Sequence, residues 1–255
     1  MQEYNGKVVL ISGGVGDIAL AIARAYLDNG AIVALSDRLT LDQAQPKLGE
    51  FSWYGDQLNY QCIDVTDGHA VQNWVDSMAT IYGKIDISIV NAAQVTLKNF
   101  RELSFEEWQR EQRVNVDGSF FLASASAKVF VEKSVRGNIV FLGSWAAHAV
   151  HANLPAYSVS KAAVRMLCQS MALEFAPWGI RINEVAPGYV NAGLSKVVWE
   201  KYPDSQEAAK EKVPLKNIIE IEDIAKQVLW ITSESNKHMT GATVLMDGGL
   251  SLIRP

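Results

Sequence analysis

Cysteine is scarce in this sequence, with only Cys62 and Cys168 among 255 residues. The two are far apart, match no metal-binding spacing and lie in apolar segments, so we expect buried free thiols and a reduced, cytoplasmic setting. Long apolar runs are also absent, since none approaches the roughly 18 residues of a membrane span. The first residues lead at once into a predicted strand, so no signal peptide is expected.

Positive charge is not in excess either. The net charge of −5 favours neither nucleic acid nor an anionic membrane surface as a partner. His148 and His151 lack partners at ligand spacing, so no metal site is expected.

Apolar residues, in contrast, make up 49% of the chain, which is enough for a substantial core. No internal repeat or linker interrupts the chain, so residues 1–255 are predicted to form a single domain.

The first forty residues contain a unit associated with dinucleotide binding. Residues 7–12 (KVVLIS) form a continuous apolar run typical of a central parallel strand. A glycine-rich turn at 13–16, a helix expected over 19–29 and a second strand over 31–36 follow, and this strand closes on Asp37. A strand, a glycine turn, a helix and a strand that ends in an acidic residue are the context in which a dinucleotide fingerprint is meaningful.

The rest of the chain continues the alternation of strands and helices. Further strands are predicted over 58–63, 85–90, 138–142, 180–186 and 243–246. Helices are predicted over 68–82, 104–116, 120–132, 194–213 and 222–233, and another around Tyr157. This order predicts an α/β fold, a Rossmann-type doubly wound parallel sheet of about seven strands with helices on both faces.

Tyr157 and Lys161 are the first candidates for catalysis. Their spacing of four residues places both side chains on one face of a helix. A free tyrosine has a pKa of about 10, and a nearby ammonium stabilises the phenolate and lowers that value. An apolar stripe from Val159 to Leu173 predicts that the pair lies off the core-facing side of the helix. The alternative is an ordinary surface pair on a helix, since the spacing alone is weak evidence.

Ser144 strengthens the case, because it directly follows strand 138–142, where ligands gather in parallel sheets. Together, Ser144, Tyr157 and Lys161 resemble the site of the short-chain dehydrogenase/reductase family. The resemblance implies that Tyr157 is the general acid/base, that Lys161 lowers its pKa and orients the cofactor ribose, and that Ser144 binds the substrate oxygen. It also implies that Asn115 completes a catalytic tetrad through a bound water. Asn115 could instead be a buried amide that satisfies backbone groups.

The same resemblance implies a nicotinamide cofactor along the carboxyl ends of the strands. The implied contacts are Ser12, Gly13, Gly16, Asp17, Ile18, Asp37, Arg38, Asp64, Val65, Asn91, Ala92, Ala93, Tyr157, Lys161, Pro187, Gly188 and Val190. Asp37 is expected to accept hydrogen bonds from the adenosine ribose and to repel a 2′-phosphate, which favours NAD over NADP. Arg38 keeps NADP open as the less favoured cofactor.

Several positions depart from the family pattern. Asp17 and Ala19 replace the second and third fingerprint glycines, Val90 and Ala93 alter the motif after the fourth strand, and Ala192 replaces a threonine. Asp17 either caps the helix or turns away from the phosphate-binding amides. These departures support an alternative function, a catalytically weakened ligand-binding or regulatory protein on the same fold. A carrier-protein reductase that uses NADPH would need more basic residues near the ribose.

The substrate is expected to be a small alcohol or ketone, more a polyol or sugar than a lipid, because aromatic and hydrogen-bonding residues are mixed in two loops. The expected substrate contacts are Trp145, His148, His151, Tyr189 and Trp199. These residues could instead only pack the loops. Residues 189–213 have the character of a lid over the cleft. The family pairs its subunits through helices such as 120–132, so the resemblance implies a homo-oligomer, in the family a tetramer.

Overall fold

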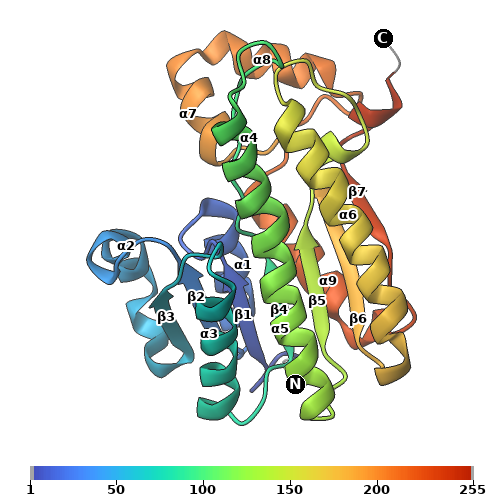
Figure 1. Ribbon diagram of the computed structural model, residues 1–255. Helices are drawn as coiled ribbons and strands as arrows, with labels where there is room; N and C mark the ends of the chain where they lie inside the picture. Colours follow the sequence, from blue (N-terminus) through green and yellow to red (C-terminus); the bar gives the residue numbers. More distant parts are fainter. Residues whose placement is uncertain (1–2, 254–255) are drawn as a thin grey trace.

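The computed structural model describes residues 3–253 and confirms the predicted fold class. Seven strands form one parallel sheet in the order β3-β2-β1-β4-β5-β6-β7 (Figure 1). The strands are β1 (Val8–Ser12), β2 (Ile32–Asp37), β3 (Leu58–Cys62), β4 (Ile87–Val90), β5 (Asn138–Leu142), β6 (Arg181–Pro187) and β7 (Thr243–Met246). The order reverses between β1 and β4, and ligands bind parallel sheets at such a switch point, beyond the carboxyl ends of the strands.

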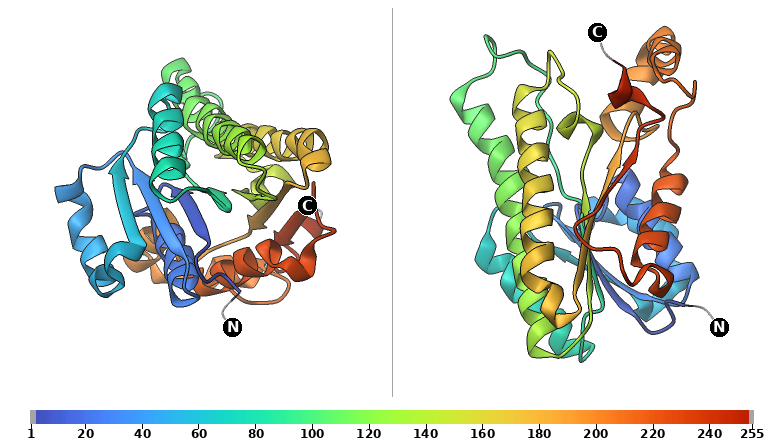
Figure 2. Two further views of the ribbon diagram at one scale, coloured as in Figure 1. Left: turned by 90° about the horizontal axis from the view of Figure 1, so that it is seen from below. Right: turned by 90° about the vertical axis from the view of Figure 1, so that its right-hand side faces the viewer.

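Helices cover both faces of the sheet, as the view from below shows (Figure 2). One hydrophobic core lies between the sheet and α1 (Asp17–Asp28), α2 (Leu41–Leu48) and α9 (Ile221–Thr232). A second core lies between the other face and α3 (Gly68–Ile81), α5 (Gly118–Glu132) and α6 (Pro155–Phe175). The right-handed crossovers that connect parallel strands produce this double layer.

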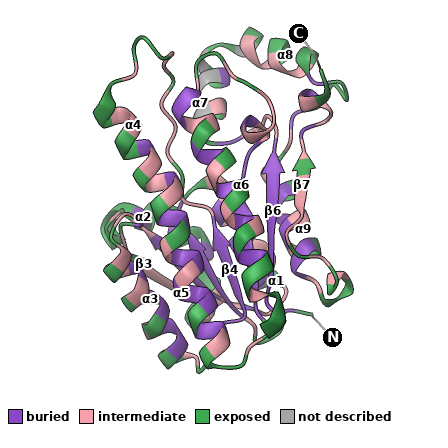
Figure 3. Ribbon diagram, turned by 45° about the vertical axis from the view of Figure 1, so that its right-hand side comes forward, coloured by how far each residue is buried: buried purple, intermediate pink, exposed green. Residues whose placement is uncertain are grey.

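The central strands are buried along their whole length (Figure 3). Such strands are covered on both faces, which explains why their sequences are continuous apolar runs rather than alternating ones. The two outer strands, β3 and β7, are mostly half-buried. Cys62 ends the outer strand β3 and is exposed, so the prediction that both thiols are buried is wrong for Cys62 and confirmed for Cys168.

The glycine turn after β1 brings the backbone close to the loop after β4. Gly13 has a φ of 63°, and a Cβ at this position would lie only 2.9 Å from the Cα of Ala92. A side chain is therefore excluded there for both conformational and steric reasons. Helix α1 begins at Asp17, two residues earlier than expected, and its N-cap is Gly16. Asp17 consequently lies inside the first turn, and its interpretation as an N-cap is wrong.

The predicted helix over 104–116 is shorter than expected. Helix α4 (Phe105–Gln112) begins with the predicted capping box between Ser104 and Glu107. It passes into one turn of π-helix over Arg113–Asp117 before α5 begins at Gly118. Such π-turns are frequent at functional sites, and this one contains Asn115.

Helix α6 is rotated relative to the prediction. Its buried face includes Ala156, Lys161 and Val164, whereas Met166 and Leu173 of the expected core stripe are 61% and 82% exposed. Lys161 therefore points into the protein. The apolar stripe faces outward, so it does not build the core of this chain.

Two short helices, α7 (Gly193–Lys201) and α8 (Pro203–Lys212), stand above the carboxyl ends of the strands (Figure 1). They fall within the segment 189–213 that the sequence analysis predicts to be a lid. Across residues 3–253, no helix combines the length and the apolar character needed to cross a membrane.

Candidate active site

Two cavities lie side by side at the carboxyl ends of the strands. The larger has a volume of about 750 Å³ and extends from the glycine turn to β2 and β3. The smaller has a volume of about 320 Å³ and contains the ends of β5 and β6. Gly16, Asn91 and Ala93 border both, so the two cavities form one continuous site.

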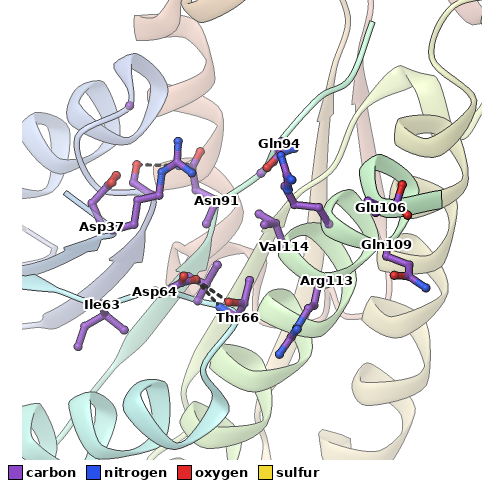
Figure 4. A pocket seen from close by; sticks show the side chains of 17 residues that line it. Asp37, Ile63, Asp64, Thr66, Asn91, Gln94, Glu106, Gln109, Arg113 and Val114 are labelled. Carbon is purple, nitrogen blue, oxygen red and sulfur yellow. Dashed lines mark hydrogen bonds between the residues drawn. The ribbon is translucent and has the colours of Figure 1, made fainter. Parts of the chain in front are cut away.

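The larger cavity contains more than half of the predicted cofactor contacts. Those that line it are Gly13, Gly16, Asp37, Arg38, Asp64, Val65, Asn91, Ala92 and Ala93. Figure 4 shows Asp37 and Asn91 on one side of this cavity, with Gln109 and Arg113 on the other. The second wall comes from α4 and the π-turn. Sequence reasoning missed it, because no motif marks these polar residues.

Asp37 ends β2, Asp64 lies just after the neighbouring strand β3, and both line the larger cavity. The Asp37 carboxylate accepts from the backbone N–H groups of Val15 and Leu39, both at 3.3 Å. Asp64 accepts from the backbone N–H and the hydroxyl of Thr66, at 2.9 and 2.8 Å. Asp37 is therefore held in place by the glycine turn itself, and its long hydrogen bonds leave capacity for further donors.

Ser12 is the one predicted cofactor contact that lines neither cavity. It is buried, and its hydroxyl accepts from the N–H groups of Asn91 and Ala92 at 3.1 and 3.2 Å. The Asn91 amide donates back to the carbonyls of Ser12 and Gly13. Ser12 thus connects the end of β1 to the loop after β4 and supports the turn from below, and its contact with a cofactor stays a prediction.

The smaller cavity brings three predicted catalytic residues together. Ser144, at the end of β5, and Tyr157 and Lys161, on α6, all line it. The remaining predicted contacts that line it are Asp17, Ile18, Pro187, Gly188 and Val190. Residues separated by 170 positions in the chain therefore surround one space, as expected for the switch point of a parallel sheet.

Tyr157, Ser144 and Lys161 line the same cavity. The Ser144 hydroxyl acts on Tyr157 to lower its pKa, and the Ser144 Oγ accepts from the N–H of Ala146 at 3.1 Å. The Lys161 Nζ lies 5.6 Å from the centre of the Tyr157 ring and donates to the carbonyl of Leu142 at 2.7 Å. The Lys161 side chain is thus held by the end of β5.

Burial dominates the protonation of this pair. It raises the pKa of Tyr157 to about 12, against a smaller lowering by the hydrogen bond from Ser144. Burial likewise lowers the pKa of Lys161 to about 8. The sequence analysis predicts a lowered tyrosine pKa, and that prediction is wrong for the protein without cofactor. The phenol is desolvated, and the ammonium is directed at the carbonyl of Leu142.

Asn115 does not line either cavity. Its fully buried amide accepts from the N–H of Gln94 at 2.7 Å and donates to the Gln94 carbonyl and to Ser160, both at 2.9 Å. Ser160 in turn donates to the carbonyl of Tyr157 at 2.8 Å. The amide therefore satisfies backbone groups, one of the two interpretations left open above, and connects α6 to the loop after β4.

Asp17 connects the glycine turn to the start of α7. Its carboxylate accepts from the N–H of Gly193 at 2.9 Å and pairs with Lys47 of α2 at 3.2 Å. Lys47 also donates to the carbonyl of Val15. These contacts hold the pKa of Asp17 below its usual value, with the Gly193 hydrogen bond as the largest favourable cause. The carboxylate is therefore turned away from the amides of α1.

The five predicted substrate contacts do not line the smaller cavity. Trp145 meets His151 and Tyr189 edge-on, with ring centres 4.2 and 5.3 Å apart. Trp199 is buried in a small core, against which Trp145 and Tyr189 pack. Burial lowers the pKa of His148. The charge of Arg165 lowers that pKa further, and the charge of Asp247 raises it. These contacts match the alternative interpretation, in which the aromatic residues hold the loops and the lid segment together.

Within residues 3–253, no three His, Cys, Asp or Glu side chains gather in a way that could hold a metal ion. The polar groups of the site are instead a phenol, a hydroxyl, an ammonium and backbone N–H groups. This set suits the binding and protonation of an oxygen-containing organic substrate beside a nucleotide.

Comparison with known proteins identifies the class to which this fold and site belong. A family model described as enoyl-(acyl carrier protein) reductase matches residues 14–251. The chain belongs to the short-chain dehydrogenase/reductase family, whose members use a nicotinamide cofactor.

Among its relatives is D-arabinitol 2-dehydrogenase [ribulose-forming] of Scheffersomyces stipitis, 29% identical over 97% of this chain and 94% of that protein. Glucose 1-dehydrogenase 2 of Bacillus subtilis is 28% identical over 98% of this chain and 97% of that protein. The solved structure of ElxO with NADP bound superposes with a TM-score of 0.91 at 25% identity, covering 97% of this chain and 99% of that one. The chain is thus an oxidoreductase of this family.

Proposed function

We propose that this protein interconverts a secondary alcohol and a ketone with NAD as the cofactor, and that its substrate is a polyol or a sugar. The observation that carries the proposal is the convergence of Ser144, Tyr157 and Lys161 on one cavity that continues into a second cavity bordered by Asp37. Family membership supports the reaction class. The names of the arabinitol and glucose dehydrogenases support the substrate class.

The residues present suit a dinucleotide. The larger cavity extends from Asp37, at the end of the second strand, to the switch point, where Gly13 and Gly16 of the glycine turn line it. Asp37 would hold the adenosine ribose, and Lys161 would hold the ribose near Tyr157. When bound, the cofactor supplies or accepts the hydride.

The chain's own residues then transfer the proton. Tyr157 gives its hydroxyl proton to the oxygen of a ketone, or takes the proton of an alcohol in the opposite direction. Ser144, which lines the same cavity as Tyr157, donates to the same oxygen as negative charge develops on it. Charged Lys161 stabilises the phenolate that remains. We propose that Asn115, which connects α6 to the loop after β4, also positions a water that relays the proton.

Size also favours a small substrate. The smaller cavity has a volume of about 320 Å³, at the lower end of the range for ligand pockets, and it must also hold one end of the cofactor. We propose that residues 189–213 close over the substrate, and that the aromatic contacts of Trp145 and Tyr189 anchor this lid.

We also propose that the chain forms a homo-oligomer through α5 and α6. Phe120, Val159, Met166 and Leu173 of these helices are between 46% and 82% exposed. Clustered apolar side chains on a surface indicate a protein contact, and a homo-oligomer uses such a patch symmetrically.

A turnover screen tests the proposed function. Pentitols, hexitols and aldoses are incubated with NAD or NADP, and the reduced cofactor is followed by its absorbance. The proposal predicts turnover of at least one polyol or sugar with NAD. Binding of NAD without turnover of any alcohol or ketone would favour the alternative, a ligand-binding protein on this fold.

Cofactor preference follows from Asp37. We expect Asp37→Ala to weaken NAD binding roughly tenfold, since one charged hydrogen bond contributes about 1.5 kcal/mol, and to strengthen NADP binding by removing repulsion. Asp37→Asn is the matched variant that keeps the shape and loses the charge, so it should mainly strengthen NADP binding. Calorimetric titration measures both affinities. Equal affinity of the unmodified protein for NAD and NADP would refute the assignment.

Asp17 is expected to weaken cofactor binding through its charge. Asp17→Asn keeps an oxygen that can accept from Gly193 and releases Lys47 toward a phosphate, so NAD should bind about fivefold more tightly. This corresponds to about 1 kcal/mol, the repulsion at close range reduced by solvent and salt. The gain should shrink in added salt, and Asp42→Asn, at an exposed acid of α2, should show none. Unchanged affinity in Asp17→Asn would mean that the carboxylate does not face the phosphates.

A further inference from the structure

A buried carboxyl lies beneath helix α6, in a part of the sheet that the proposed function does not use. Glu184 is in the middle of β6, opposite Phe141 of β5, and none of its surface is exposed. Thr243 of β7 donates to its Oε2 at 2.6 Å. Its Oε1 has no hydrogen-bond partner among the residues that the structure describes. A buried, half-satisfied carboxyl is costly unless a nearby charge compensates it.

The Glu184 carboxyl lies directly against Gly143. A Cβ on Gly143 would lie 1.9 Å from Oε1 of Glu184, so the carboxyl fills the space that a side chain would need. The residue before Gly143 is Leu142, whose carbonyl accepts from Nζ of Lys161 at 2.7 Å. The carboxyl and the ammonium therefore meet adjacent residues at the end of β5, the strand that leads to Ser144.

The charges around the pair come from three elements. Among the charged groups that act on Lys161, Glu184 has the largest effect, and Glu111 of α4 is second. On the other side, Lys161 and Arg165 of α6 stabilise the ionised form of Glu184, together with the Thr243 hydroxyl. Burial is the largest cause acting on both groups, so it raises the pKa of Glu184 and lowers that of Lys161, while the charge of each group opposes this effect on the other.

We infer that Glu184 is a positioning residue of the proposed reaction, whose buried carboxylate keeps Lys161 charged and directed at the end of β5 beside Tyr157. The consequence for turnover rests on the proposed function, whereas the electrostatic pairing concerns this chain alone. The signal for it in the sequence is an acidic residue inside the predicted strand IRINEVA, which also contains Arg181 and Asn183.

Glu184→Gln tests the pairing directly, because it keeps the shape of the side chain and removes its charge. Lysine side chains are isotope-labelled, and the Lys161 signal is identified by its loss in Lys161→Met. We expect the titration midpoint of Lys161 to fall from about 8 to roughly 7, a tenfold change in its ionisation. An unchanged midpoint in Glu184→Gln would overturn the inference.

Two control variants separate this effect from general damage. Asp86→Asn neutralises a buried carboxylate that pairs with Lys7 and Lys84 near the opposite end of the sheet, so it should leave the Lys161 midpoint unchanged. Glu111→Gln should lower that midpoint by less than Glu184→Gln does. A larger effect of Glu111→Gln would make Glu111 the main counter-charge and would contradict the inference.

A reciprocal measurement covers the case in which Glu184→Gln does not fold. Coupling between two ionisable sites is symmetric, so Lys161→Met should raise the titration midpoint of the labelled Glu184 carboxyl by the same factor. An unchanged Glu184 midpoint in Lys161→Met would overturn the pairing without use of the first variant.

Turnover provides the last measurement, provided that the proposed function holds. In Glu184→Gln the alkaline limb of the kcat/KM profile should move to lower pH about as far as the Lys161 midpoint does, because neutral Lys161 no longer stabilises the phenolate. Asp86→Asn should leave the profile in place even where it lowers stability.

A shifted Lys161 midpoint in a protein without turnover would refute the proposed function and leave the pairing intact. A shifted midpoint with an unmoved profile would refute the role of Glu184 in the reaction.

Discussion

Tyr157→Phe is expected to lower kcat/KM by more than about 100-fold, the usual contribution of a general acid/base. The ring keeps its packing on α6, and only the oxygen that exchanges the proton is lost. Affinity for NAD should therefore change by no more than a few-fold. Steady-state kinetics and calorimetry on the same preparation measure the two quantities.

Tyr189→Phe is the matched control for this prediction. Tyr189 belongs to the aromatic contacts around Trp145 and does not line the cavity of Tyr157, so loss of its hydroxyl should leave turnover within a few-fold. Retention of more than about a hundredth of the activity in Tyr157→Phe would show that another group handles the proton.

Lys161→Met should have an effect of similar size on turnover and a second effect on binding. The substitution removes the positive charge beside a phenol whose pKa burial raises to about 12, so the phenolate form becomes harder to reach. We expect a loss of at least about 100-fold in kcat/KM. NAD affinity should fall roughly tenfold as well, since charged hydrogen bonds to the ribose are lost.

The combination of lost turnover and weakened NAD binding distinguishes Lys161 from Tyr157, whose substitution is expected to affect turnover alone. Circular dichroism and the Tm of Lys161→Met show whether the fold survives the loss of a buried charge. A folded Lys161→Met that binds NAD as tightly as the unmodified protein would contradict the proposed contact with the ribose.

Much of the fold follows from patterns that are local in the sequence. The central strands are buried on both faces, so each is a continuous apolar run, and the predicted strand over 138–142 coincides with β5. The glycine turn was predictable because Gly13 occupies a backbone conformation that few other residues adopt. The resemblance of Ser144, Tyr157 and Lys161 to the site of a known family predicted that they lie together, and they line one cavity.

Features that depend on packing between distant elements were not predictable in this way. The apolar stripe of α6 resembles a core-facing stripe, yet Met166 and Leu173 are exposed and Lys161 is buried. Periodicity cannot distinguish a face that packs against the sheet from one that packs against another subunit. The prediction of a lowered Tyr157 pKa was wrong for a related reason, because desolvation depends on the surrounding structure rather than on a neighbour in the sequence.

The central claim is that a hydride passes between a polyol or sugar and NAD at the Tyr157 site. The most direct test uses a pentitol deuterated at the carbon that becomes the ketone, with NAD, the unmodified protein and Tyr157→Phe. We expect the unmodified protein to yield a ketone without that deuterium and a reduced cofactor that carries it, whereas Tyr157→Phe should yield neither above background. A ketone formed without deuterium in the cofactor, or equal deuterium transfer by Tyr157→Phe, would contradict it.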